Sequence, residues 1–215
     1  MAPKSITFLI VDDDADLRDS IVRYLTVKGG FTCVGQYGHA QEALANLPAK
    51  PPSVVLMDIK MKGMDGIECV RRLKEKMPEI LVIMLTVFED EDLIFDALMA
   101  GATGYLLKRQ PPEELLDAIH ELLAGGSPMS ATIARKVVKL LQRSGSASKS
   151  TVGPRALLSD RQREMLELLA IGEPYKAIAD KMGLSIHTVR GYIRRIYEKL
   201  QVHTRTEAVA KYLRK

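Results

Sequence analysis

The feature that most constrains the fold is a short apolar run that ends in a carboxylate. Residues Val54–Met57 are all apolar, Pro51-Pro52 precedes them, and Asp58 follows them directly. An unbroken run of this length predicts a strand buried on both faces, as in a parallel sheet. Asp58 would then lie at the carboxyl edge of the sheet, where open α/β folds carry their sites. Taken alone, however, a single aspartate at a strand end is more often a helix N-cap or a solvated turn residue.

The same pattern recurs along the first 125 residues. Apolar runs typical of strands alternate with stretches that have the apolar spacing of helices. We expect strands at 6–11, 32–37, 54–57, 81–85 and 104–107. We expect helices after the first strand and at 41–47, 67–76, 92–100 and 113–124. Five strands that alternate with five helices predict an α/β domain with a parallel sheet covered on both faces, and Met57, Met84 and Met99 are expected in its core.

Polar side chains follow four of these strands. The strand ends carry Asp12, Asp13, Asp58, Thr86 and Lys108. Because the carboxyl ends of parallel strands share one edge, these side chains should converge on one rim. Crowded carboxylates repel one another unless a cation lies among them, and hard oxygen ligands suit Mg²⁺. With an ammonium and a hydroxyl nearby, the set favours phosphoryl transfer to Asp58.

Charge divides the chain into two unlike halves. Residues 1–125 contain 13 Lys/Arg and 20 Asp/Glu, a net charge of −7, whereas residues 126–215 contain 18 and 7, a net charge of +11. This asymmetry indicates that only the second half binds a polyanion. Between the halves, a helix is expected at 131–142, able to pack on either one. Residues 143–154 then have the composition of a linker.

The second half has the spacing of a helix-turn-helix. Ser159 is an expected N-cap with Gln162 in the capping-box position, and Gly183 can adopt the positive φ of the turn. Val189 and the apolar residues that follow at helical spacing form a buried face on the next helix. Its outer face carries basic side chains, which can contact guanine edges and phosphates. A basic helix face alone is usually only solvated, but here it coincides with the turn pattern and the basic half.

The motifs of the first half resemble the receiver domain of bacterial two-component response regulators. They are IVDDD (10–14), VVLMDIKMKGMDG (54–66), MLT (84–86) and GATGYLLK (101–108). The resemblance implies a doubly wound, flavodoxin-like fold over residues 1–128. It also implies that Asp58 accepts a phosphoryl group from a sensor histidine kinase, that Mg²⁺ is the cofactor, and that dephosphorylation is slow, with no other enzymatic activity. The implied roles are metal ligands Asp12, Asp13, Asp58 and the backbone carbonyl of Lys60; phosphoryl-binding Thr86 and Lys108; and the aromatic switch Tyr105.

Three positions depart from that family's usual pattern. Lys62 and Arg109 stand where proline is frequent, and bulky Val87 follows Thr86 where a small residue is common. None of these changes removes an acid, the hydroxyl or the lysine. They leave the lifetime of the phosphoryl group open.

The second half resembles the LuxR-type helix-turn-helix of the NarL/FixJ class of regulators. The motifs are LSDRQREMLELLA (158–170), IADKMGLSIHTVRGYIRRIYEKL (178–200) and VHTRTEAV (202–209). The resemblance implies an all-α DNA-binding domain over residues 157–215, joined to the receiver by a helix and flexible linker at 129–156. It implies base contacts by Arg190, Gly191 and Arg194, backbone contacts by Thr188, Arg195 and Lys199, and a fourth helix at 205–213, capped by Thr204, that mediates dimerisation.

Together these features favour a transcriptional regulator controlled by phosphorylation. Its partners would be a sensor histidine kinase, double-stranded DNA and, once phosphorylated, a second copy of the chain. One alternative is a Mg²⁺-dependent phosphohydrolase with Asp12 or Asp14 as nucleophile, although Asp16 stands where that pattern needs Thr or Val. Another is a regulator in which the acidic pocket is only a structural Mg²⁺ site.

Cellular location is inferred from what the sequence contains. Cys33 and Cys69 have neither a disulfide-framework nor a metal-ligand spacing and are expected to be buried thiols in a reducing compartment. The longest apolar run is too short to span a bilayer, and the N-terminus turns acidic where a signal peptide would be cleaved. We therefore expect a cytoplasmic protein with no membrane partner.

Overall fold

The computed structural model describes residues 6–47, 51–145 and 158–213. The first part alternates strands and helices as expected, with boundaries within one or two residues of the predicted ones. Its strands are β1 (Thr7–Val11), β2 (Thr32–Tyr37), β3 (Val54–Met57), β4 (Val82–Thr86) and β5 (Gly104–Leu107). Its helices are α1 (Ala15–Val27), α2 (Ala40–Ala45), α3 (Gly66–Lys76), α4 (Glu91–Met99) and α5 (Pro112–Leu123).

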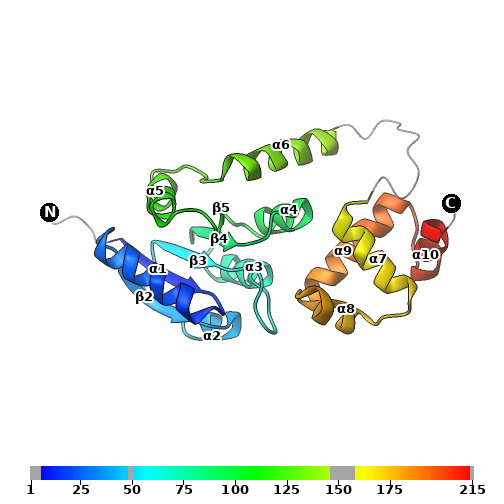
Figure 1. Ribbon diagram of the computed structural model, residues 1–215, viewed down its shortest axis with the longest axis horizontal. Coiled ribbons are helices and arrows are strands. Elements are labelled where there is room, and N and C mark those ends of the chain that lie inside the picture. Colours follow the sequence, from blue (N-terminus) through cyan, green and yellow to red (C-terminus); the bar gives the residue numbers. More distant parts are fainter. Residues whose placement is uncertain (1–5, 48–50, 146–157, 214–215) are drawn as a thin grey trace.

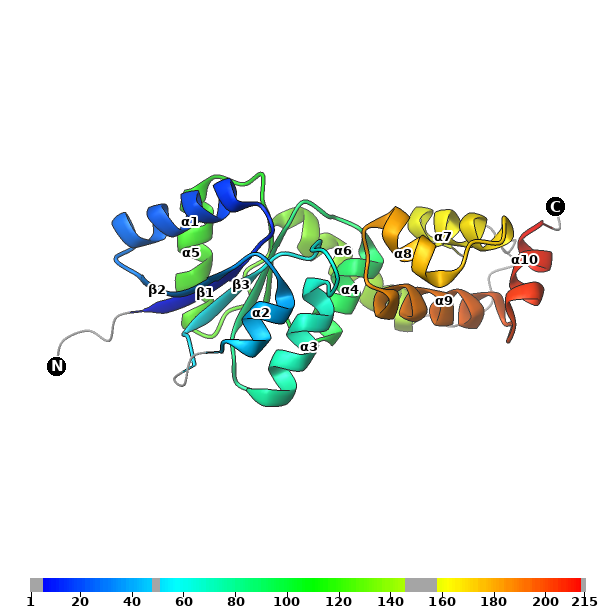
Figure 2. The ribbon, with the colours of Figure 1, turned by 90° about the horizontal axis from the view of Figure 1, so that it is seen from below.

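The five strands form one parallel sheet in the order β2-β1-β3-β4-β5. Helices α1 and α5 cover one face, and α2, α3 and α4 cover the other (Figure 2). The predicted α/β doubly wound fold is therefore confirmed. All residues of β3 and β4 are buried, which explains why these strands read as continuous apolar runs.

Aspartate side chains cap the N-termini of three of the helices. The side chains of Asp14, Asp65 and Asp90 accept hydrogen bonds from backbone N–H groups in the first turns of α1, α3 and α4. The expectation for the methionines is confirmed for Met57 and Met84, which are fully buried, but was wrong for Met99, whose exposure is 71%. Met99 is the last residue of α4 and faces solvent beyond the edge of the core.

A sixth helix, α6 (Ala131–Gly145), follows the sheet. Helix α6 packs along α4, and its Ile133 is fully buried (Figure 1). The sequence left open which half of the chain this helix contacts; in the structure it contacts the first half. The Nζ of Lys136 also donates to the backbone carbonyl of Glu89, 2.5 Å away, just before α4. The helix continues to Gly145, three residues into the predicted linker, and the rest of that linker lies outside the described residues.

The last part is all helical: α7 (Asp160–Ala170), α8 (Tyr175–Met182), α9 (Ile186–Leu200) and α10 (Arg205–Leu213). The capping box of Ser159 and Gln162 is present at α7, and Thr204 Oγ1 accepts from the N–H of Glu207 at α10. Gly183 ends α8 with φ of +63°, which opens the turn to α9. The predicted helix-turn-helix is confirmed.

The two parts lie in direct contact. Helix α9 packs beside α3, and the α8–α9 turn points at the carboxyl edge of the sheet (Figures 1 and 2). In the described parts of the chain, no helix combines the length and apolarity needed to cross a membrane.

Candidate functional site: an acidic pocket and a basic helix

The acidic pocket lies at the carboxyl edge of the sheet. Asp12 directly follows β1 and Asp58 directly follows β3, and both are buried, whereas Asp13 is exposed. One carboxylate oxygen from each of the three lies within 4.8 Å of the others. Parallel strands put these residues side by side although 46 positions separate Asp12 from Asp58. Three carboxylates at this spacing offer the hard oxygen ligands that Mg²⁺ prefers, so the residues present fit that ion.

Lys108 bridges the pocket. Its Nζ lies 2.9 Å from Asp12 Oδ2 and 3.0 Å from Asp58 Oδ2, and the side chain is only 12% exposed. Burial lowers the pKa of this ammonium, but the two carboxylates raise it more, so the net direction is upward. Lys108 therefore stays charged at neutral pH and can neutralise anionic oxygens at Asp58.

The pKa of Asp58 is raised, mainly by burial. Desolvation raises its pKa from 3.8 to about 6, against the opposing effect of Lys108 and with a smaller upward effect of Asp12. One carboxylate oxygen accepts the backbone N–H of Ile59 at 2.7 Å, which orients the group. At neutral pH the carboxylate is ionised and available as a nucleophile.

This raised pKa predicts a pH-dependent stability difference. Between pH 3.8 and about 6 the folded protein binds more protons at Asp58 than the unfolded chain, so this group's contribution falls as pH rises through that window. Asp58→Asn removes the effect. In EDTA we expect the variant to be more stable than wild type by about 3 kcal/mol at pH 7, and we expect the difference to vanish in acid. Urea unfolding across pH measures it; a difference that does not change with pH would contradict the prediction.

Thr86 and Tyr105 lie on either side of the loop after β4. Both side chains are fully buried. Thr86 Oγ1 accepts the N–H of Phe88 at 3.4 Å, and the Tyr105 hydroxyl donates to the carbonyl of Phe88 at 3.0 Å. Burial raises the pKa of Tyr105, so it remains a donor at all relevant pH values. Tyr105, the predicted aromatic switch, is therefore buried and held to the loop after β4.

The remaining predicted residues of the pocket are placed as follows. Lys60 lies two residues after Asp58, and its exposed side chain extends against Gly183 of the α8–α9 turn. Asp14 is exposed and caps α1 through Leu17 N–H, so it is not part of the pocket and cannot serve as its nucleophile. Val87 is 65% exposed and leaves the pocket's interior free. Of the two cysteines, only Cys69 is buried; Cys33 is partly exposed, contrary to expectation.

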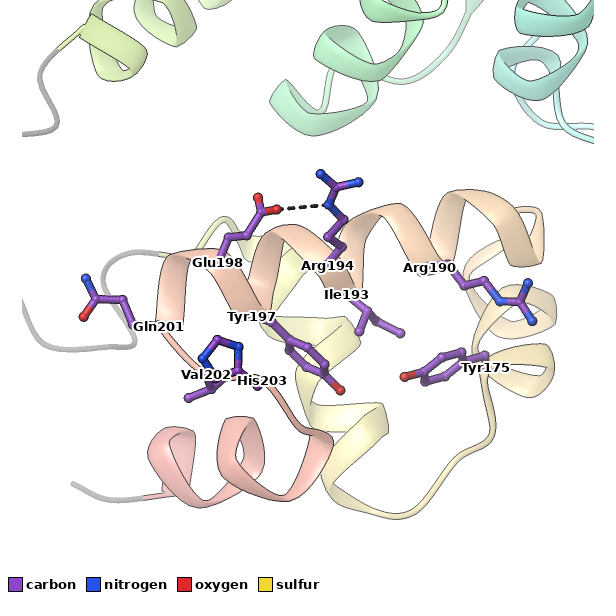
Figure 3. Close-up of a pocket in the computed structure, with 9 residues that line it drawn as sticks. All are labelled: Tyr175, Arg190, Ile193, Arg194, Tyr197, Glu198, Gln201, Val202 and His203. Carbon is purple, nitrogen blue, oxygen red and sulfur yellow. Dashed lines mark hydrogen bonds and ion pairs between the residues drawn. The ribbon is translucent and has the colours of Figure 1, made fainter.

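The predicted DNA-contacting residues on α9 divide into two groups. Arg190 and Arg194 are exposed, on the side of α9 away from its contact with the first part of the chain, and Gly191 lies between them in sequence. They line an open hollow of about 660 Å³ with Tyr175 and Tyr197, where Arg194 pairs with Glu198 (Figure 3). An exposed ion pair of this kind is weak, so Arg194 is free to exchange Glu198 for another acceptor.

Of the other three predicted residues on α9, two are held by the first part of the chain and one by α7. Thr188 is buried and donates to Asp65, and Arg195 is paired with Asp96. Lys199 donates to Gln162 Oε1 at 2.8 Å. Burial raises the pKa of Asp96 despite the nearby Arg195 guanidinium. The contact with the first part of the chain therefore covers Thr188 and Arg195 of the predicted backbone-contacting set, but not Lys199, and it leaves the predicted base-contacting residues open.

Four carboxylates at this contact were not identified from the sequence: Asp65, Asp90, Asp92 and Asp96. Asp65 and Asp90 could have been found as N-caps, because each precedes an apolar helix. Their second role, contact with α9, depends on how the two parts are arranged, and no local pattern contains that information. The same holds for Tyr192, whose hydroxyl reaches Asp90 Oδ1 at 3.0 Å.

Comparison with known proteins gives a consistent result for both parts. Residues 8–120 match the model of the response regulator receiver domain, and residues 156–212 match that of the bacterial regulatory proteins of the luxR family. The chain is 34% identical to the DNA-binding transcriptional activator DevR/DosR of Mycobacterium tuberculosis, covering 94% of this chain and 92% of that protein. It is 29% identical to the nitrate/nitrite response regulator protein NarL of Escherichia coli, with the same coverage. Among solved structures, the response regulator ChrA of a heme-sensing two-component system is similar over 96% of both chains, at 31% identity and a TM-score of 0.53.

Proposed function

The chain belongs to the two-component response regulators that join a receiver domain to a LuxR-type DNA-binding domain, and on that premise we propose that phosphorylation of Asp58 frees α9 to bind DNA. The chain is a DNA-binding transcriptional regulator, not an enzyme that turns over an external substrate. The single observation that carries the proposal is that two acids that hold α9, Asp65 and Asp90, lie in the segments that follow β3 and β4, the strands that end at Asp58 and Thr86. A sensor histidine kinase would supply the phosphoryl group, and a DNA-binding role would place the protein in the cytoplasm.

We propose the unit boundaries that the sequence analysis predicts; the family matches at residues 8–120 and 156–212 support them. We assign the receiver to residues 1–128, the connecting helix and linker to 129–156 and the DNA-binding domain to 157–215. Asp12, Asp13, Asp58 and the carbonyl of Lys60 would hold Mg²⁺, which would screen charge on the phosphoryl oxygens. Lys108 would bind one of those oxygens in place of its present contacts with Asp12 and Asp58.

A chain of contacts connects the pocket to α9. Phosphorylation adds about −1.5 to −2 charge and three acceptor oxygens beside Thr86. If the Thr86 hydroxyl turns toward them, Phe88 loses the acceptor of its N–H, while its carbonyl still holds Tyr105. Asp90, two residues further on, is the acceptor for Tyr192 of α9. Movement of this loop would therefore weaken the contact that holds α9.

The energy required sets a scale for this switch. Inverting a two-state equilibrium from 1:99 to 99:1 takes about 5.5 kcal/mol of differential stabilisation. Charge-assisted hydrogen bonds from Lys108, Thr86 and the loop N–H groups to a phosphoryl group are each worth about 1.5–3 kcal/mol. A few of them suffice. The released protein would dimerise, through α10 among other contacts, and bind two half-sites about one helical turn apart.

The test uses wild-type protein, a small acyl phosphate as donor and mixed-sequence duplex DNA. We expect the donor with Mg²⁺ to add one phosphoryl group by intact mass, to produce dimers in sedimentation and to tighten DNA binding about tenfold or more. EDTA should prevent all three. A protein that gains the phosphoryl group but changes neither its assembly nor its DNA affinity would contradict the proposal.

A further inference from the structure

The contact between the receiver and the DNA-binding domain pairs acids on one side with donors on the other. Asp65 Oδ2 accepts the backbone N–H of Ser185 at 3.1 Å and the hydroxyl of Thr188. Asp90 accepts the hydroxyl of Tyr192, and Asp96 binds the guanidinium of Arg195. Each of these acids is an anionic oxygen acceptor, as a phosphate is.

The donors lie on one side of α9. Positions 185, 188, 192 and 195 are separated by three, four and three residues, which aligns them along a helix. Ser185 is the N-cap of α9, so its end of the row also has the positive end of the helix dipole. This row lies next to Gly191, one of the predicted base-contacting positions, and away from the exposed side of α9 that carries Arg190 and Arg194. When a recognition helix enters the major groove, the sides of the helix next to the base-reading face lie against the phosphate backbones.

Burying carboxylates at this contact is costly unless each finds donors. Asp65 is fully buried and Asp92 is 6% exposed, and Asp92 accepts from both Ser159 Oγ at 2.6 Å and Gln162 Nε2 at 3.2 Å. A contact whose only task was steric cover could be apolar. The acids at this contact match a surface whose donors are arranged for anions.

We propose that this side of α9 is a phosphate-binding row and that Asp65, Asp90 and Asp96 occupy the positions that DNA phosphates take in the complex. The row consists of the Ser185 N–H, Thr188, Tyr192 and Arg195. This proposal adds Tyr192 and Ser185 to the predicted DNA contacts. It also means that the receiver competes with DNA phosphates for the same donors on α9, rather than only blocking access to the helix. The inference rests on the proposed function in that this domain binds duplex DNA, but it does not require that phosphorylation be the trigger.

The test separates loss of the receiver contact from loss of a DNA contact. Full-length Asp96→Asn and Asp90→Asn serve as backgrounds in which the competing acid is already neutralised. Fluorescence anisotropy with a mixed-sequence duplex about three helical turns long, over a range of salt, reports affinity and its salt slope. Phosphate contacts are independent of sequence, so no operator is needed. Without donor, both backgrounds should bind about three- to tenfold more tightly than wild type.

On these backgrounds the α9 variants should then weaken binding. Arg195→Ala in Asp96→Asn should lower the slope of log Kd against log salt by about 1, and Arg195→Lys should restore it. Tyr192→Phe in Asp90→Asn should weaken binding about fivefold. The control is Arg163→Ala, which removes a half-exposed, ion-paired arginine from α7; it should change neither value.

The outcomes are distinct. If the receiver variants bind more tightly but Arg195→Ala and Tyr192→Phe change neither slope nor affinity, the receiver acts as a steric cover and the phosphate-row proposal is wrong, while the proposed function stands. If neither wild type nor any variant binds duplex DNA, with or without donor, the proposed function itself fails. If the α9 variants weaken binding while the donor has no effect, the row is retained and phosphorylation is not the trigger.

Discussion

Asp58→Ala should leave the protein folded but unresponsive to a phosphodonor. The substitution removes the nucleophile and one of three clustered carboxylates, while Lys108 keeps Asp12 as a partner 2.9 Å away. Donor and Mg²⁺ should then add no phosphoryl group, and the gain of DNA affinity of about tenfold or more should disappear. The measurement pairs intact mass with anisotropy on the same samples.

The matched control for this result is Asp19→Ala. Asp19 is an exposed carboxylate on α1, so its removal changes the net charge equally without changing the pocket. It should be phosphorylated and activated like wild type. If Asp58→Ala still gains a phosphoryl group and its DNA affinity still rises with donor, another residue is the acceptor and the pocket has a structural role only.

Gly66→Ala should have the largest effect on stability. Gly66 begins α3 where the chain turns back over the phosphoacceptor loop, and its N–H donates to the carbonyl of Ile59 at 2.9 Å. A Cβ there would lie 1.8 Å from the carbonyl oxygen of Asp58 and 3.0 Å from Met57 Cγ. Backbone atoms of a buried strand end cannot move aside cheaply, so we expect a loss of about 3 kcal/mol or more, or failure to fold.

Urea unfolding of Gly66→Ala, compared with Gly38→Ala, tests this argument. A Cβ at Gly38 would meet only Arg18 Nη1, at 3.8 Å, so that variant should differ from wild type by about 0.5 kcal/mol or less. Any Gly66→Ala protein that does fold should have displaced Asp58 and be phosphorylated poorly. Wild-type stability in Gly66→Ala would contradict the close approach seen here.

Much of the fold could be predicted from local pattern. The buried strands, the carboxylates at their ends and the capping box at Ser159 are each specified by residues within a short window, and parallel pairing then brings Asp12, Asp58 and Lys108 together. Whether an apolar side chain at the end of a helix is buried was harder to predict. Met99 is apolar at helical spacing, yet it is exposed because α4 ends there.

The arrangement of the two domains could not be predicted, for a physical reason. Asp65 and Asp90 are good N-caps whether or not another domain is present, and Tyr192 is apolar enough to be an ordinary core residue. Their contacts depend on which surfaces meet after the linker, and the local sequence is compatible with several packings. Only the charge difference between the halves hinted that acids of one would bind donors of the other.

The central claim is that phosphorylation separates α9 from the receiver, and an interdomain distance tests it most directly. Spin labels at Glu75→Cys on α3 and Glu164→Cys on α7, both exposed positions, report that distance when Cys33 is replaced by serine; Cys69 is buried and can remain. With Mg²⁺ and donor, we predict that the narrow distance distribution of the resting protein becomes longer and broader, and that Asp58→Ala keeps the narrow one. An unchanged distribution in fully phosphorylated protein would contradict the account.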